Sequence, residues 1–286
     1  MANNFKENTM QFRYLSAILL CLMISTTLLQ AQDETVEEPG WTPAFSMKFR
    51  SINGVTMSPD GSTIAYVVRK PVMVGEKSEY LSHIWIANVD GKMNFQYTQG
   101  EKSAISPAFS PDGQYLTFLS ARGKEKAKTQ VWSMRVMGGE AIQITSTKAG
   151  VASYKWSPDG TRIAFTMRDP ETAEEEKAKK EKRHVVLVNQ QYKYSHLYVI
   201  SFLEDEEGER KTQRLTSGNV HISAFDWSAD GKTIAFAHQP DPRINTSGLA
   251  RDIASVPADS GAVTQLVTWE GADNNPRYSP DGRWIA

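Results

Sequence analysis

The sequence of 286 residues contains a single cysteine, Cys21, which lies inside an apolar run near the amino terminus. With no second cysteine the chain can form no internal disulfide, and it offers no thiolate cluster to a metal ion. We interpret Cys21 as part of a leader that is removed, so the mature chain is expected to have no thiol nucleophile. An exported protein without disulfides fits a bacterial periplasm or outer surface better than a eukaryotic secretory route.

The leader is predicted at residues 1–31. Lys6 and Arg13 precede the apolar run 14–31, which ends in Ala31, and this is the layout of a secretory signal peptide. The run is shorter than the ~20 apolar residues of a spanning helix, which leaves an uncleaved anchor as the less favoured alternative. Residues 32–44 are then a linker. We expect an exported protein, in the periplasm or outside a Gram-negative-type bacterium, with no membrane contact after cleavage.

The chain also lacks an excess of charge and the common catalytic motifs. It has 32 basic and 33 acidic residues, so no basic stripe predicts a nucleic-acid partner. Neither G-x-S-x-G nor H-E-x-x-H occurs, which removes the nucleophile elbow and the common zinc helix. We therefore assign no catalytic residue, no metal ligand, no cofactor and no identified substrate-binding residue to this chain.

The five histidines form no cluster in the sequence. His83 and His196 occupy the same position of the repeat described below, before "IWI" and "LYV", and are expected to start strands. His184, His221 and His238 are scattered single residues. Isolated histidines of this kind are more often structural than metal ligands.

A repeat dominates what the sequence does contain. Ser-Pro-Asp-Gly follows an aromatic residue or methionine four times, and a fifth copy has Ala229 in place of proline. The serines of the five copies are separated by 52, 47, 71 and 51 residues, and a threonine marker keeps the same rhythm with intervals of 47, 71 and 52. Two markers with matching intervals define a repeated unit, with an insertion in the third. The markers are Ser58, Ser110, Ser157, Ser228 and Ser279, and Thr98, Thr145, Thr216 and Thr268.

Each unit contains four short strand-like pieces rich in β-branched and aromatic residues. In "TIAYVV", Ile64, Tyr66 and Val68 share one face and Ala65 and Val67 the other. Apolar residues on both faces indicate a strand that is covered on both sides. Four antiparallel strands in about 50 residues are the blade of a β-propeller, so we predict an all-β fold.

The last unit ends within its second strand, at Ala286. We therefore expect a partial propeller at residues 45–286, with four complete blades and about half of a fifth. Because propellers close as rings, the sequence is interpreted as the N-terminal part of a longer chain.

The repeated aspartate and glycine are predicted to form turns. Proline fits the second position of a type I turn, the aspartate side chain can bond nearby backbone, and glycine takes the left-handed position. One aspartate in each turn gives too few ligands for calcium, so we favour a structural role. The predicted turn residues are Asp60, Gly61, Asp112, Gly113, Asp159, Gly160, Asp230, Gly231, Asp281 and Gly282.

The insertion in the third unit, residues 169–195, is strongly charged. Glu175 and Lys179, and likewise Glu176 and Lys180, stand four apart in the order that favours ion pairs on a helix. A short solvated helix is predicted. The segment is either an exposed excursion between two strands or an element that leans over the mouth of the ring and builds a binding face.

These blades resemble the propeller of the prolyl oligopeptidase family of serine peptidases, in its acylaminoacyl-peptidase and dipeptidyl-peptidase-like branch. The resemblance covers residues 45–286 and is carried by "FRSINGVTMSPDGSTIAYVV", "AFDWSADGKTIAFAH" and the charged insertion before "YKYSHLYVI" and "RLTSG". The Ser-Pro-Asp-Gly motif alone is less specific, since TolB-like periplasmic propellers share it.

The resemblance implies an α/β-hydrolase domain beyond residue 286 that carries a Ser-Asp-His triad. It implies a propeller that restricts access to short peptides, with that hydrolase domain and the peptides as partners. None of the family's catalytic residues can be assigned to a position of this chain. The alternatives are a TolB-like propeller that serves as a binding scaffold, and a propeller enzyme with its site in the central channel.

Overall fold

The computed structural model describes residues 41–286 except 125, 184, 186–191 and 247. The predicted signal peptide and most of the predicted linker lie outside these residues. Two compact units divide the chain, Met1–Phe49 and Arg50–Ala286. The described part of the first unit contains α2 (Pro43–Ser46) and three packed aromatic rings. The ring centroid of Trp41 lies 5.8 Å from that of Phe45 and 5.3 Å from that of Phe49.

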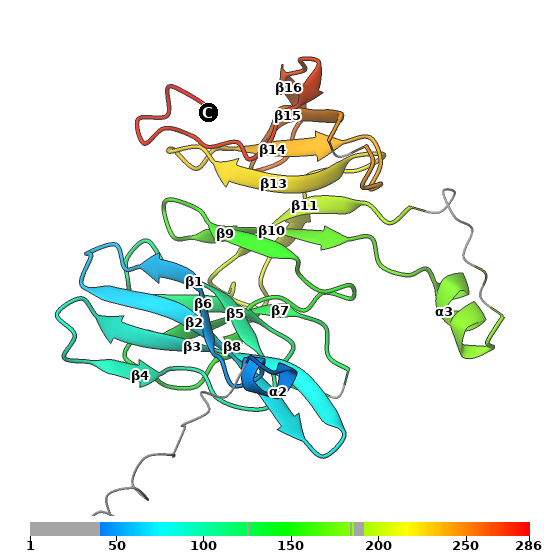
Figure 1. The fold of residues 1–286 in the computed structure, drawn as a ribbon. Coiled ribbons are helices and arrows are strands. Elements are labelled where there is room, and N and C mark those ends of the chain that lie inside the picture. Colours follow the sequence, from blue (N-terminus) through cyan, green and yellow to red (C-terminus); the bar gives the residue numbers. More distant parts are fainter. Residues whose placement is uncertain (1–40, 125, 184, 186–191, 247) are drawn as a thin grey trace, which may run out of the picture. The chain divides into compact units, whose positions relative to one another are not determined.

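The second unit consists of four-stranded antiparallel sheets in which neighbouring strands follow one another along the chain (Figure 1). This confirms the prediction of all-β, propeller-type blades. Blade one contains β1 (Ser51–Met57), β2 (Thr63–Val74), β3 (Lys77–Asn88) and β4 (Asn94–Gln96). Blade two contains β5 (Ala104–Phe109), β6 (Tyr115–Ser120), β7 (Gln130–Arg135) and β8 (Ile142–Gln143).

The third and fourth blades repeat this order. Blade three contains β9 (Ser153–Trp156), β10 (Arg162–Arg168), β11 (Ser195–Ser201) and β12 (Thr212–Arg214), with α3 (Ala173–Lys180) between β10 and β11. Blade four contains β13 (His221–Trp227), β14 (Thr233–Gln239), β15 (Ala250–Pro257) and β16 (Thr264–Val267). A short strand, β17 (Gly271–Ala272), pairs with β15 in parallel. The fifth unit contributes a bridge between Tyr278 and Ile285.

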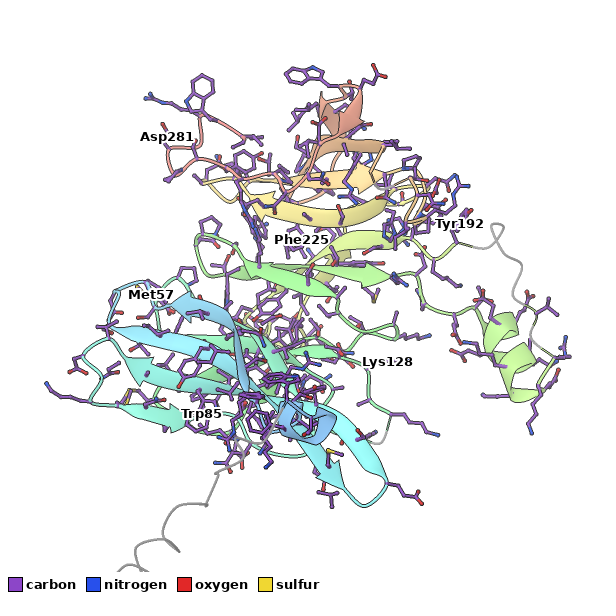
Figure 2. The ribbon with its side chains drawn as sticks, viewed as in Figure 1. Met57, Trp85, Lys128, Tyr192, Phe225 and Asp281 are labelled. Carbon is purple, nitrogen blue, oxygen red and sulfur yellow. The ribbon has the colours of Figure 1, made fainter. Side chains whose placement is uncertain are left out.

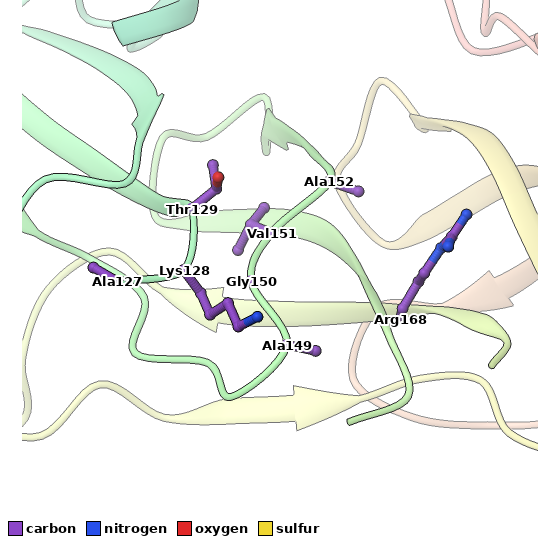
Figure 3. Close-up of a pocket in the computed structure, with 8 residues that line it drawn as sticks. All are labelled: Ala127, Lys128, Thr129, Ala149, Gly150, Val151, Ala152 and Arg168. Carbon is purple, nitrogen blue, oxygen red and sulfur yellow. The ribbon is translucent and has the colours of Figure 1, made fainter. Parts of the chain in front are cut away.

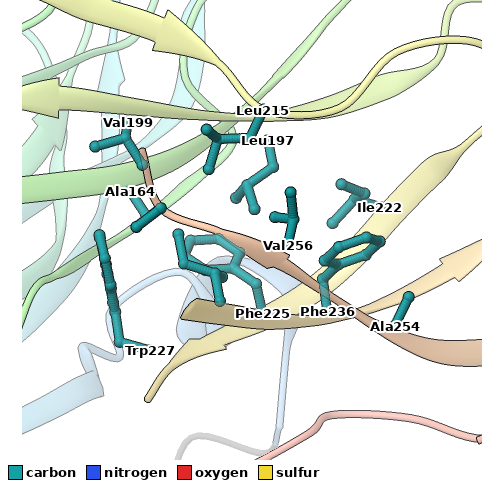
Figure 4. Packing of buried hydrophobic residues seen from close by; sticks show 12 residues of the cluster. Ala164, Leu197, Val199, Leu215, Ile222, Phe225, Trp227, Phe236, Ala254 and Val256 are labelled. Carbon is teal, nitrogen blue, oxygen red and sulfur yellow. The ribbon is translucent and has the colours of Figure 1, made fainter. Parts of the chain in front are cut away.

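Three apolar clusters join the four blades in sequence order, because each cluster takes residues from two consecutive blades. Between blades three and four, β14 contributes the large side chains of Ile234 and Phe236, and β10 contributes the small Ala164 (Figure 4). All three are fully buried. The second strand of a blade thus presents large residues to the preceding blade and small ones to the next.

The first blade departs from this two-sided burial. Ala65 and Val67 of β2 are buried in the cluster shared with blade two. Ile64, Tyr66 and Val68, on the opposite face, are only half-buried. The prediction that this strand is covered on both sides therefore holds for one face, since no described blade packs against the other.

Candidate functional site

The five Ser-x-Asp-Gly turns connect the first and second strands of each unit through one set of hydrogen bonds. In the copy with Ala229, the Ser228 hydroxyl donates to Asp230 Oδ1 at 2.7 Å, and the Lys232 N–H donates to the same oxygen at 3.0 Å. The Gly231 N–H donates to the Ser228 carbonyl oxygen at 2.9 Å, and Gly231 has φ +67°. The equivalent glycines are also left-handed: Gly61, Gly113, Gly160 and Gly282.

These bonds occupy the aspartate side chains. The Ser58 hydroxyl is the main cause that lowers the pKa of Asp60 to about 2, and serine hydroxyls likewise lower the pKa of Asp112, Asp230 and Asp281. At Asp159 burial acts in the opposite direction, but the bonds from Ser157 and Thr161 still leave the pKa lowered. A charged carboxylate that holds its own turn is a structural element.

The turns also contact one another from blade to blade, which the sequence did not reveal. The ring of Pro111 lies 3.4 Å from the position that a β-carbon would take on Gly160. Pro158 approaches Gly231 in the same way at 3.6 Å. The residue after each serine therefore packs on the glycine of the next turn. The other two pairs are Pro59 with Gly113, at 3.7 Å, and Ala229 with Gly282, at 3.5 Å.

A charged network joins the first strands of the later units. Lys155 on β9 donates to Asp226 on β13 at 2.7 Å. The other oxygen, Asp226 Oδ2, accepts the N–H of Tyr278 at 3.0 Å. Arg277 lies 3.6 Å from Asp226 Oδ1, the oxygen that Lys155 binds. Burial lowers the pKa of Lys155, although the hydrogen bond that Lys155 donates to Asp226 opposes this shift. The network links three units at equivalent positions, so its evident role is to hold the blades together.

The charged insertion begins at the opposite end of blade three, where β10 ends at Arg168. Its base is closed by two hydrogen bonds: the Asp169 N–H donates to the Tyr194 carbonyl at 2.8 Å, and the Tyr194 N–H donates to Asp169 Oδ2 at 3.1 Å. The same carboxylate lies 3.5 Å from both His196 and Arg214. Burial, followed by the charge of Arg214, lowers the pKa of His196. Asp169 thus anchors the insertion to the blade.

The predicted helix of the insertion is present as α3, but its ion pairs differ from the expectation. Glu175 caps the helix together with Thr172 and binds Lys193 at 2.6 Å instead of pairing with Lys179. Lys179 pairs with Glu171. Lys193, on the chain that returns from the insertion, thus takes the place that the helix spacing predicted for Lys179 as the partner of Glu175. His184 and residues 186–191 lie outside the described residues.

His83 and His196 occupy equivalent positions, as their sequence context indicated. Each lies within hydrogen-bonding distance of a threonine marker: His83 Nδ1 is 3.4 Å from Thr98 Oγ1. The marker threonine also accepts the N–H of the following strand residue, at 2.9 Å from Ile84. In blade two Gln130 takes the histidine's place and accepts the Thr145 hydroxyl at 2.8 Å. These histidines are therefore structural.

The prediction that His83 starts its strand is wrong, because β3 begins at Lys77. The hairpin of β2 and β3 continues in register beyond the length of the other blades, with Val74 paired to Lys77. His196 is the second residue of β11. His221 accepts the N–H of Ser195 at 3.1 Å, and His238 lies 3.1 Å from Gln265.

A pocket of about 270 Å³ lies where blades two and three meet. Its walls are the segment 127–129 before β7, the segment 149–152 before β9, and Arg168 (Figure 3). Because β10 runs from its turn to Arg168, this pocket lies at the end of the blade away from the turns. In Figure 2, Lys128 of the pocket and Tyr192 of the insertion lie on the side opposite to Met57 and Asp281, which mark the turns.

Glycine allows the two walls of this pocket to touch. Gly150 has φ +85°, and a β-carbon there would stand 3.2 Å from the Thr129 carbonyl oxygen. The Val151 N–H donates to that oxygen at 2.7 Å. The sequence signal for this close approach was the lone glycine in "KAGVA", between the threonine marker and the next first strand.

Within the described residues, no group of three or more histidine, cysteine, aspartate and glutamate side chains is placed to hold a metal ion. No helix in that part of the chain is long and apolar enough to cross a membrane. The features that could contact a ligand are thus the pocket, the insertion and the loops around them.

Comparisons with known proteins agree with this architecture. The chain is 31% identical over 235 residues to the uncharacterized peptidase YuxL of Bacillus subtilis, covering 82% of this chain and 29% of that protein. It is 24% identical over 274 residues to dipeptidyl-peptidase 5 of Porphyromonas endodontalis, covering 88% and 39%. The chain thus spans well under half the length of these relatives.

The fold is shared with the acylaminoacyl peptidase of Pyrococcus horikoshii, with a TM-score of 0.54 at 18% identity over 80% of this chain and 34% of that one. Residues 45–192, just over half of the sequence, match the family described as PD40, the TolB β-propeller domain. The repeated blades and this match lead to one conclusion: the chain belongs to the TolB-type PD40 β-propeller family.

Proposed function

We propose that this chain is the propeller portion of an exported serine exopeptidase, of aminopeptidase or dipeptidyl-peptidase type, and that it gates and positions short peptides. The observation that carries the proposal is the similarity of more than four fifths of the chain to two proteins named as peptidases. A propeller beside a catalytic domain limits access by size, so short peptides reach the site and folded proteins do not. The signal-like leader at residues 1–31 supports export.

The charged insertion of blade three is the part of the chain best suited to gating. It projects between β10 and β11 on a base held by Asp169 and Tyr194. No residue of α3 is buried, so the helix is available to restrict access. These two hydrogen bonds, between Asp169 and Tyr194, involve only residues next to β10 and β11, so they can form when the rest of the insertion is removed.

Labelling of the purified full-length protein by a fluorophosphonate probe tests the serine peptidase. We expect covalent labelling together with cleavage of chromogenic dipeptides. Gating is tested separately by replacing residues 171–193 with a short glycine-serine link while Asp169 and Tyr194 are retained. The ratio of kcat/KM for long peptides to that for dipeptides should rise, whereas a mutation of the solvated Glu174 to Gln should leave it unchanged.

A second candidate function is a scaffold that binds proteins or ligands without catalysis. The family match favours it, since that family is named for the TolB propeller. Full-length protein that remains unlabelled by the probe and leaves all dipeptides intact would support the scaffold and reject the peptidase.

A further inference from the structure

The joint between blades three and four contains a hydrogen bond whose acceptor can take up a proton. The N–H of Ser195, the first residue of β11, donates to Nδ1 of His221, the first residue of β13, at 3.1 Å. The two strands are neighbours across the joint (Figure 1). Since a backbone N–H can only donate, this bond requires a neutral His221 with its proton on Nε2.

The equivalent joints between the other blades contain no titratable acceptor at this place. His221 stands seven residues before the serine of its turn, and the residues at the same distance from the earlier turns are Ser103 in blade two and Gly150 in blade three. The Ser103 hydroxyl accepts the N–H of Ser82, the counterpart of Ser195, at 3.1 Å. Gly150 has no side chain to accept a bond. Of the three described joints, the one beside the charged insertion is therefore the one that can respond to pH.

The bond from Ser195 to His221 supports the base of the insertion. Ser195 directly follows Tyr194, whose carbonyl oxygen and N–H bond to Asp169 at 2.8 and 3.1 Å. Asp169 connects this base to blade three, because its carboxylate lies 3.5 Å from His196. The bond to His221 connects the same base to blade four. Loss of this bond would leave the insertion attached to its own blade alone.

The charges around His221 oppose its protonation. Burial is the main cause that lowers the pKa of His221 below its usual 6.5, and three basic neighbours act in the same direction. Asp241 opposes them, but its carboxylate is bound by Arg243 at 3.0 and 2.8 Å. A protonated His221 would thus face fixed positive charge as well as the N–H of Ser195. The charged or titratable groups that act on His221 come from β10, β11, β15 and the connection after β14: Arg168, His196, Arg251 and Asp241.

His196, the second histidine at this joint, would respond to acid in the opposite sense. Its Nε2 lies 3.5 Å from the carboxylate of Asp169, and its Nδ1 lies 3.3 Å from the hydroxyl oxygen of Thr216. A proton added to His196 would create an ion pair with Asp169, and the Thr216 oxygen could still accept a bond. Protonation of His196 therefore tightens the base of the insertion, and only protonation of His221 breaks a bond there.

We propose that protonation of His221 opens the joint between blades three and four and loosens the base of the insertion. An imidazolium ring carries a proton on both nitrogens, so no rotation of the ring restores an acceptor for the Ser195 N–H. The joint is closed above the ordinary histidine pKa and opens as the pH falls through the lower pKa of the folded protein. The opening itself does not depend on the proposed function; its consequence, a weaker restriction on long peptides in acid, rests on it.

Hydrogen exchange of the full-length protein, followed by mass spectrometry of peptides that contain Ser195, tests the opening. After correction for the intrinsic exchange rate at each pH, protection of the Ser195 amide should be constant above about pH 7. Below about pH 6.5 it should fall by up to about tenfold for each pH unit until the pKa of folded His221 is passed, because one proton is taken up on opening.

Three variants separate His221 from the other histidines. His221→Ser supplies the acceptor found at Ser103 in the joint between blades one and two, so it should make the protection independent of pH. His196→Gln copies Gln130 of blade two and should retain the acid response. His238→Gln, which removes a histidine that contacts Gln265 on the same blade, is the matched control and should also retain it.

Protection that does not change with pH would overturn the inference, and so would an acid response that survives in His221→Ser or disappears in His196→Gln. Gating is measured by the ratio of kcat/KM for long peptides to that for dipeptides, in which the titration of catalytic groups common to both substrates cancels. The ratio should rise in acid in the parent protein and stay constant in His221→Ser; a constant ratio in both would reject the link to gating. A protein that shows the exchange response but is never labelled by the fluorophosphonate probe rejects the peptidase and keeps the pH-dependent joint.

Discussion

The close approach of segments 127–129 and 149–152 makes Gly150→Ala the sharpest test of how the blades are joined. The new methyl group would lie 3.2 Å from the Lys128 β-carbon and from the Thr129 carbonyl oxygen, and 3.3 Å from the Thr129 nitrogen. Two of these atoms are backbone, so they cannot rotate away, and the oxygen also accepts the 2.7 Å hydrogen bond from Val151. The substitution must therefore strain the joint or break that bond.

Two contributions set the size of the effect. A left-handed backbone costs a non-glycine residue about 1–2 kcal/mol, and overpacking adds about 1–3 kcal/mol. We expect Gly150→Ala to lower the free energy of unfolding by about 2–5 kcal/mol. Gly218→Ala is the matched control, since Gly218 has φ +78° and nothing within 4 Å of the β-carbon position. It should lose only the conformational part, about 1–2 kcal/mol.

Urea unfolding followed by tryptophan fluorescence measures both variants against the parent protein. The difference between the two losses isolates the contact with the Thr129 backbone. If Gly150→Ala and Gly218→Ala lose the same amount, the two segments separate without penalty, and our account of the joint is wrong.

Three further predictions concern the turns and the core. Ala229→Pro should raise the free energy of unfolding by about 0.4–1 kcal/mol, because the Ala229 turn has the bonds of the proline-containing turns; a lower melting temperature would contradict this. Lowering the pH should destabilise the protein between about pH 4 and about pH 2, because the pKa of Asp60 is about 2 in the fold against an ordinary 3.8. The stabilisation is present above the unfolded pKa and is lost as the pH falls through the folded one, so Asp60→Asn should flatten the acid dependence of the urea midpoint, and an unchanged slope would refute it. Phe236→Ala, at a side chain with 0% exposure, should cost about 3–5 kcal/mol, whereas Phe95→Ala, 41% exposed, should shift the urea midpoint far less; equal shifts would exclude a special role for the interface between blades.

The blades were predictable from the sequence because their turns are local. The serine, aspartate and glycine of one turn lie within a stretch of four residues. Their hydrogen bonds stay within that stretch or reach at most two residues past it, as from the Thr233 N–H to Ser228. The alternation of Ile234 and Phe236 with small residues was likewise visible along one strand. Chemistry that is complete within ten residues can be recognised without knowing the fold.

Contacts between blades could not be predicted in this way. Lys155 and Asp226 are paired across two blades and stand 71 residues apart. The partner of Glu175 is Lys193, on the returning chain, and not the neighbour that helix periodicity favoured. The pocket itself depends on two separate connections that meet at Gly150. Each of these requires the distance between strands that only the packed sheets define.

The packing of each turn on the next gives the row of blades a direction. Every turn presents a proline or alanine on one side and a glycine without a side chain on the other, so the two sides of each unit differ and only unlike sides pack together. Such a head-to-tail contact can be repeated by any number of units, and it sets no limit of its own. A whole unit could thus be duplicated or lost in evolution with the contact preserved, whereas a reversed unit would bring proline against proline. The number of blades must then be fixed by the angle at which each blade packs on its neighbour.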